Sequence, residues 1–223
     1  MKTLLIVLCS ITLLVPIGCA DAGQLSYTST IPLTTTNWSN TISFPMFDPA
    51  LGTLDRITFV LTGHVEGAAM FESMETIPAT VTANLSAKLT LMRPDNSLLV
   101  MAIPVASVTE TVDSFDGTID FSGASGRKYE GLSANRVETL TVFPPSADFG
   151  LFSGAGNIVL PIKAEGFSSG SGAGNLLLQF NTLASAQATI TYDYTAVPEP
   201  SGILALLTGI GGMAGLLSRY RRA

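Results

Sequence analysis

The amino-acid sequence predicts one all-β domain between residues 23 and 195, a single β-sandwich of the jelly-roll or immunoglobulin-like kind. Three observations predict this fold class. The stretch is rich in Thr, Ser, Val, Ile and Gly, which favour strands and turns over helices. Apolar and polar residues alternate in several segments with the period of two that a half-buried strand shows. Turn-forming residues separate these segments, and no long stretch has helical spacing.

The clearest alternation covers residues 79–91, and a second covers residues 57–65. In the first segment one face is apolar and the other is mostly polar, which predicts a strand with one face in the core. The residues of the apolar face are Val81, Ala83, Leu85, Ala87, Leu89 and Leu91. The other predicted strands cover residues 24–31, 36–44, 98–108, 137–143, 157–164, 176–180 and 186–194. This spacing indicates a sandwich of about eight strands.

Turn signals lie between these strands. Residues 93–96 (Arg-Pro-Asp-Asn) predict a hairpin turn, and the two prolines of residues 143–145 predict the end of a strand. Residues 168–174 consist of Ser, Gly and Ala, which predicts a flexible loop. The middle of the chain is expected to be less regular because it contains Gly117, Gly123, Gly126 and Gly131.

The first 22 residues have the pattern of a secretory signal peptide with an apolar signal helix. Lys2 gives a positive start, residues 4–15 are apolar, and Ala20 and Ala22 fit the small-x-small cleavage pattern. An alternative interpretation takes Cys19, after Ile-Gly, as the acylated cysteine of a lipoprotein. Either interpretation predicts export.

The last 28 residues have the order of a sorting tail. The motif of residues 197–201 contains Val197, Pro198, Glu199 and Pro200. An apolar run at 203–217 follows, and then a basic end at 219–222. We expect the run to form a hydrophobic helix, but a comfortable span needs about 20 residues, so it fits only a thinned bilayer or a transient anchor. Basic flanks tend to stay cytoplasmic, which places the body outside the cytoplasm.

Motif, apolar run and arginines in this order resemble the PEP-CTERM sorting signal of Gram-negative bacteria. That resemblance implies recognition by an exosortase, contact with the membrane before processing, and a host that makes extracellular polysaccharide. The alternative is a plain C-terminal membrane anchor. The predicted organisation is a signal peptide at 1–22, a β-sandwich at 23–195 and a sorting tail at 196–223.

The predicted body is acidic and has no cysteine. Residues 23–195 contain 7 Lys and Arg against 15 Asp and Glu, a net charge of −8. This charge argues against nucleic acid as a partner, and against anionic polysaccharide unless divalent cations bridge the two. Both cysteines, Cys9 and Cys19, lie in the predicted signal peptide, so the mature body is expected to have no disulfide.

Two motifs, at residues 47–54 and 115–126, resemble the choice-of-anchor E family. The resemblance implies a secreted all-β body with one of several sorting tails, and it supplies no reaction or catalytic residue. Physically, Phe47 and Leu51 are expected to fix a turn before a strand. Pro49 sets φ there, Asp48 can accept a hydrogen bond from the backbone two residues on, and Gly52 allows an unusual dihedral angle.

One oxygen-rich loop and two isolated side chains are the candidate binding residues. Asp113, Asp116 and Asp120 could supply ligands to Ca²⁺, or they could serve only in turns, because their spacing departs from that of an EF-hand. His64 is the single histidine. Without a nucleophile elbow or further zinc ligands, it is expected to lie on a strand, at a sheet edge or surface. Trp38 is expected to pack in the core or at an edge, and is otherwise the available platform for a sugar.

These observations favour a secreted, exosortase-sorted protein of the cell surface or the extracellular polysaccharide matrix, with a structural or adhesive role and no enzymatic activity. The alternative is a carbohydrate-binding module, either without a cofactor or assisted by Ca²⁺. A hydrolase that acts on glycans through two carboxylates is a third hypothesis, although no pair stands out among the 15 acidic residues of the body.

Overall fold

The computed structural model describes residues 22–197, and these residues form two antiparallel β-sheets. The first has the strand order β1-β10-β3-β7, and the second has the order β2-β8-β4-β5, with β6 and β9 also paired to β4. The strands are β1 (Ala22–Thr35), β2 (Trp38–Pro45), β3 (Gly52–Ser73), β4 (Ala79–Met92), β5 (Leu98–Ala102), β6 (Val105–Val112), β7 (Gly126–Val142), β8 (Asn157–Gly166), β9 (Ser169–Ser171) and β10 (Leu176–Ala196). Two short helices, η1 (Pro49–Leu51) and α1 (Asp148–Leu151), lie in the connections.

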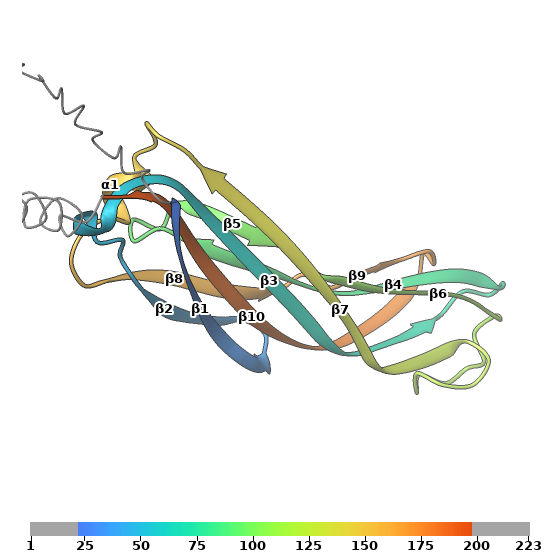
Figure 1. Cartoon of the computed structure of the whole chain (residues 1–223). Helices are drawn as coiled ribbons and strands as arrows, with labels where there is room; N and C mark the ends of the chain where they lie inside the picture. Colours follow the sequence, from blue (N-terminus) through green and yellow to red (C-terminus); the bar gives the residue numbers. More distant parts are fainter. Residues whose placement is uncertain (1–21, 198–223) are drawn as a thin grey trace, which may run out of the picture.

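The two sheets pack face to face into a long, narrow body (Figure 1). A large apolar core fills the half that contains β1, β2 and β8, with buried side chains from both sheets such as Phe44, Phe59 and Leu160. A smaller core of Ala69, Phe71, Val81, Ala83 and Val112 fills the other half. The predicted all-β class with two packed sheets is therefore confirmed.

The alternation predicted for residues 79–91 is confirmed. Each of its six apolar residues is at most 1% exposed and lies in one of the two cores. The predicted hairpin turn is also confirmed, because the backbone N–H of Arg93 donates to the carbonyl of Ser97 over 2.9 Å and Asn96 adopts a φ of 65°. Strand β7 ends at Val142, directly before the Phe-Pro-Pro segment, as predicted.

The predicted strand lengths were wrong at several places. The strand expected at 57–65 extends over 22 residues as β3, and the strand expected at 137–143 begins at Gly126. The strands expected at 176–180 and 186–194 form one strand, β10, which is paired with β3 throughout. The polar residues between them do not interrupt β10, because β3 offers a continuous partner along the whole length of the body.

Two further expectations need correction. The strand expected at 98–108 divides into β5 and β6 around Pro104, which has no N–H to donate to β4. Residues 168–174 are not entirely a loop, because Ser169–Ser171 forms β9 against β4. Gly170 fits under the side chain of Leu178 on β10, since a Cβ at this position would lie 2.6 Å from that side chain.

Candidate functional site

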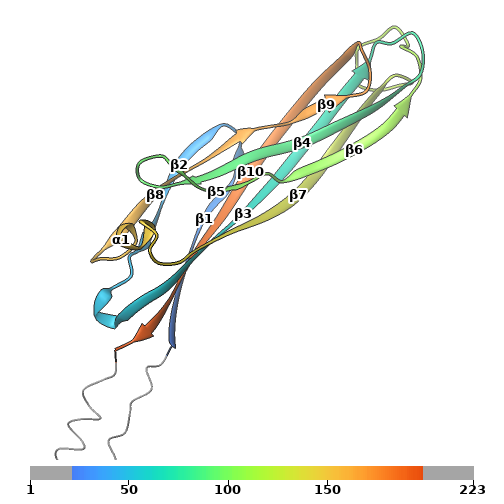
Figure 2. The ribbon, with the colours of Figure 1, turned by 90° about the horizontal axis from the view of Figure 1, so that it is seen from above.

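Both ends of the described chain lie at the same end of the body. Ala22 pairs with Thr195, and Gly52 pairs with Ala196. Figure 2 shows the two ends of the coloured ribbon side by side. Val197 is the last described residue, and its N–H donates to the carbonyl of Leu51 over 3.2 Å. We call this end the base. Ala20 of the predicted cleavage pattern and Pro198, Glu199 and Pro200 of the sorting motif lie outside the described residues, as do the two predicted apolar helices. Within residues 22–197, no helix is long and apolar enough to cross a membrane.

The motif around Phe47 closes the base. Phe47 is 1% exposed, and its ring lies 6.0 Å from that of Tyr192 and 5.3 Å from that of Tyr194, between centroids. The side chain of Asp48 accepts a hydrogen bond from the N–H of Ala50 over 2.9 Å, the contact expected from the sequence. Leu51 ends η1, directly before β3, as the predicted turn requires, but it is 41% exposed, so it contributes to the turn through its backbone rather than through a buried side chain. The short helix η1 turns Leu51 outward, toward solvent.

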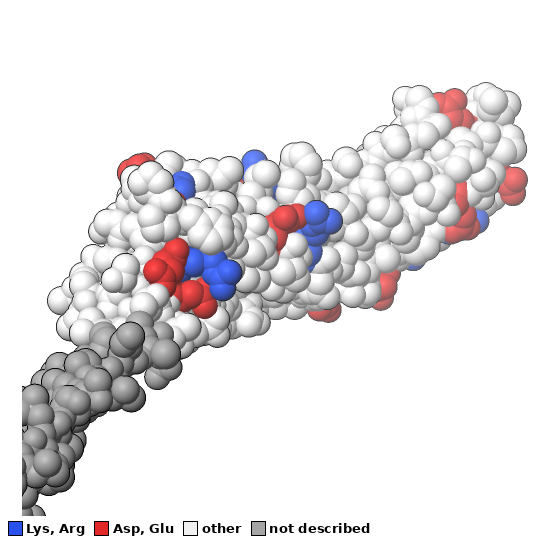
Figure 3. All heavy atoms as spheres, turned by 45° about the horizontal axis from the view of Figure 1, so that its top comes forward, with Lys and Arg blue, Asp and Glu red and all other residues white. Residues whose placement is uncertain are grey.

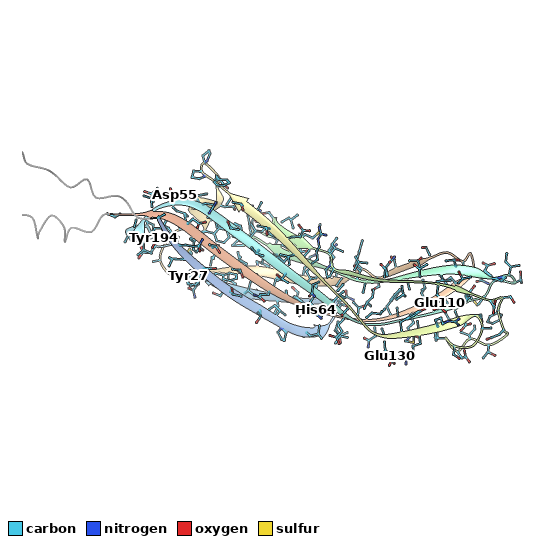
Figure 4. All side chains as sticks on the ribbon, turned by 45° about the vertical axis from the view of Figure 1, so that its right-hand side comes forward. Tyr27, Asp55, His64, Glu110, Glu130 and Tyr194 are labelled. Atoms are coloured by element: carbon cyan, nitrogen blue, oxygen red, sulfur yellow. The ribbon has the colours of Figure 1, made fainter. Side chains whose placement is uncertain are left out.

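His64 lies on β3, an inner strand of its sheet, rather than at a sheet edge (Figure 4). Its ring faces outward beside Asn135, with 2.9 Å between Nδ1 and the amide oxygen, and Nε2 lies 3.6 Å from Glu66. Trp38 is half-buried against the larger core, and its indole N–H donates to the carbonyl of Ala184 over 3.2 Å. The predicted packing of Trp38 is confirmed. The Trp38 ring therefore packs against the core, whereas the His64 ring lies beside the polar side chains of Asn135 and Glu66.

The three aspartates of the candidate Ca²⁺ loop form hydrogen bonds within the loop itself, through their carboxylate oxygens or their backbone. Asp116 accepts hydrogen bonds from the N–H of Thr118 (3.0 Å) and of Ala124 (3.2 Å). Asp120 accepts from the N–H and the hydroxyl of Ser122. The N–H of Asp113 donates to the carbonyl of Ala124. In the part of the chain that the structure describes, no group of three or more His, Cys, Asp or Glu side chains is placed to hold a metal ion.

Glu72 anchors the same loop, and sequence reasoning missed it. It lies on the outward face of β3, next to the buried Phe71, where alternation predicts an exposed side chain. The loop 113–125 folds over this face, so Glu72 is fully buried. One carboxylate oxygen accepts from the N–H of Phe121 (2.8 Å), and the other accepts from the hydroxyl of Ser125 (2.6 Å). No local sequence signal marks Glu72, because the loop that covers it is about 50 residues away in the chain.

Three loops meet at the end of the body opposite the base, and we call them the distal tip: residues 74–78, 113–125 and 172–175. The carbonyl of Glu75 accepts from the N–H of Phe115, and its side chain accepts from the N–H of Asn175, so all three loops are tied together. They contain four acidic residues and no Lys or Arg. Figure 3 shows acidic side chains at this end, far from the grey termini. Ile77 (67% exposed) and Ile119 (54% exposed) add apolar surface to the tip.

A cross-sheet contact holds the distal half together. Glu110 on β6 accepts hydrogen bonds from the hydroxyl of Tyr129 and from Nε of Arg127, both on β7 (Figure 4 labels Glu110). Arg127 also donates to the carbonyls of Gly123 and Gly126. The bond from Tyr129, followed by that from Arg127, holds the pKa of Glu110 below its usual range. Burial and the neighbouring carboxylate raise the pKa of Tyr129 to about 12.

This contact predicts a pH dependence that can be measured at one carboxylate. Because the pKa of Glu110 is lowered in the folded state, the contact stabilises the fold above the ordinary Glu pKa of about 4.3. The stabilisation is lost as the pH falls through the lowered value. In Tyr129→Phe, the pKa of Glu110 should rise toward the ordinary value in an NMR titration of its side-chain carboxyl. Tyr27→Phe, in the other half of the body, is the control and should leave it unchanged. An unchanged Glu110 titration in Tyr129→Phe would contradict the assignment.

No family model and no curated protein matches this chain. Among solved structures, it aligns over 78% of its length with 49% of the STIV MCP, at 17% identity and a TM-score of 0.25. It also aligns over 80% of its length with 42% of VP2 from the infectious bursal disease virus subviral particle, at 13% identity and a TM-score of 0.22. The chain spans about half, or less, of these proteins. At these TM-scores the likeness carries no inference about function, and the resemblances to the PEP-CTERM signal and the choice-of-anchor E family stay predictions.

Proposed function

We propose that this chain is an exported protein of a Gram-negative bacterium, sorted by an exosortase to the cell surface or the extracellular polysaccharide matrix, where it acts as a structural or adhesive element. The proposal assigns residues 1–22 to a signal helix and residues 203–217 to a hydrophobic helix. It rests on the order of motif, apolar run and arginines at the C-terminal end.

The observation from the structure that supports this role is the placement of the two chain ends. Both leave the domain at the base, where Ala22 pairs with Thr195, and the distal tip lies at the far end of the long strands β3 and β10. A body fixed through residues beyond Val197 would therefore present the distal tip away from its attachment. The tip combines four acidic residues with the exposed Ile77 and Ile119, a surface for contact with other molecules rather than for chemistry.

Deletion of residues 198–223 is the direct test. The deletion begins after Val197, so it keeps the hydrogen bond from Val197 to Leu51 and the whole of β10. We expect the shortened chain to be lost from the cell-surface and matrix fractions and to be recovered in soluble exported fractions, measured by fractionation and immunoblotting. Unchanged fractionation would overturn the sorting proposal.

Two further variants distinguish the role of the sorting motif from the roles of the apolar run and of the distal tip. Replacing Pro198 and Pro200 together with Ala keeps the apolar run, so mislocalisation of this variant would point to recognition of the motif and not to simple anchoring. Normal localisation would favour the plain membrane anchor. The matched control replaces Ile77 and Ile119 with Ser at the distal tip and should leave the fractionation unchanged. This control should instead lower the retention of matrix material or the adhesion of cells.

A further inference from the structure

The two edge strands of the first sheet, β1 and β7, differ in how they are protected. An exposed edge can pair with another chain, and charged side chains, bulges or covering groups prevent this. Strand β7 has all three devices. It has a register shift opposite Gly67 and Ala69, and Arg127 and Tyr129 reach from it to β6. Its charged residues are Arg127, Lys128, Glu130, Arg136 and Glu138.

Strand β1 has none of these devices over residues 22–31. This segment contains no charged residue and no proline, and its pairing with β10 is regular. Pro32 and a register shift between Ile31 and Thr34 come only after it. Within residues 22–197 its outer side has no strand partner, so alternate N–H and C=O groups point away from the sheet. The neighbouring edge, β2, is also uncharged, but it has eight residues and ends at Pro45.

We propose that residues 22–31 of β1 pair antiparallel with the same segment of a second copy of this chain. The unpaired N–H and C=O groups of an edge strand can form hydrogen bonds to another strand. The side chains of β1 are compatible with those of a second copy of β1. When a strand pairs with itself around a two-fold axis, the residues that face one another lie on the same side of the sheet. With Thr28 opposite its own copy, the outward Ser26 faces Thr30, so that hydroxyls meet, and the inward Leu25 faces Ile31.

The sheet already contains the contacts that this pairing would repeat. The hydroxyl of Thr28 lies 2.9 Å from that of Thr189, and the hydroxyl of Ser26 lies 3.1 Å from that of Thr191 on β10. Charge gives a second reason. The body has a net charge of −8 between residues 23 and 195, so two copies repel one another in general. We call the interface between the two copies of residues 22–31 the seam. Because this segment contains no charged residue, the seam places no like charges opposite one another.

The pairing would join two four-stranded sheets into one continuous sheet. Assembly would stop at two copies, because the other edge of each sheet is the protected β7. The two bodies would run in opposite directions, with their bases at opposite ends of the seam. This inference is independent of the sorting proposal, since it concerns only backbone and side chains of the described domain.

The test compares two lysine substitutions in the full chain, purified in a mild detergent. Thr28 and Thr139 are both exposed and lie in one cross-strand row, Thr28–Thr189–Val60–Thr139, on the same face but at opposite edges. We expect sedimentation velocity to show dimers for the wild type and for Thr139→Lys. Thr28→Lys should be monomeric, with association weakened at least tenfold. All three proteins share the same tail, so any association through the tail is common to them.

A monomeric wild type would overturn the proposal, as would dimers in both lysine variants or monomers in both. Cross-linking gives a second measurement that does not depend on disrupting the seam. In a background with Cys9→Ser and Cys19→Ser, Thr28→Cys should yield covalent dimers with a short bis-maleimide, and Thr139→Cys should not. Equal cross-linking of the two variants would also overturn it.

Discussion

Replacing Phe59 with alanine is expected to lower the free energy of unfolding by about 3–5 kcal/mol, the usual cost of emptying a buried aromatic site. Phe59 is fully buried on β3 in the larger core. Its ring packs edge to face on Phe152, with 4.8 Å between the centroids. Phe152 directly follows α1, so the variant also loosens the connection between β7 and β8. Chemical denaturation monitored by circular dichroism measures the effect.

The matched control is Val60→Ala, at the next position of the same strand. Val60 points outward from the sheet and is only partly buried, so its truncation should cost less than about 1 kcal/mol. A double-mutant cycle between Phe59 and Phe152 should give a coupling energy of about 0.5–1.5 kcal/mol. Equal losses in Phe59→Ala and Val60→Ala would show that this core does not carry the stability of the domain.

Replacing Glu72 with alanine is expected to release the loop 113–125 from the sheet. The substitution leaves the N–H of Phe121 and the hydroxyl of Ser125 without their acceptor. Each hydrogen bond to a charged group is worth about 1.5–3 kcal/mol, so the loop should lose about 3 kcal/mol or more of local stability. Hydrogen exchange of the loop amides should then be about 100-fold faster, since 1.36 kcal/mol corresponds to a factor of ten.

The design of this experiment separates loop release from general unfolding. Exchange along β4, whose residues fill both cores, should change much less than exchange in the loop. Glu130→Ala is the control, because the Glu130 side chain is 70% exposed on the neighbouring strand β7, and it should leave the loop unchanged. Glu72→Gln retains one acceptor oxygen and should have an intermediate effect. Loop exchange at the wild-type rate in Glu72→Ala would contradict the anchoring role.

Local sequence patterns predicted the places where strands lie in this domain. The alternation in β4 identified its buried face residue by residue, and the turn at residues 93–96 was predicted from its proline, aspartate and asparagine. These features depend on side chains only a few positions apart, so they can be predicted from the local sequence. The contact from Asp48 to Ala50 was predicted for the same reason.

Features that depend on distant parts of the chain were not predicted. Strands β3 and β10 are longer than their alternation suggests, because each extends the other along the body through backbone hydrogen bonds that are independent of side-chain type. Glu72 has the alternation of an exposed residue and is buried by a distant loop. The hydrogen bonds from Arg127 and Tyr129 to Glu110 join strands of different sheets, and no local pattern in the sequence predicts them.

The sequence by itself determined the all-β class, the positions of most strands and turns, and the acidic, cysteine-free character of the body. It is also the source of the predicted export signal at residues 1–22 and the predicted sorting signal at residues 196–223. The tertiary structure decided that both ends of the domain lie at the base, that the acidic loops gather at the distal tip, and that β1 is the unprotected edge. Local side-chain patterns specify strands and turns, whereas the choice of strand neighbours depends on pairing between segments as far apart as Ala22 and Thr195.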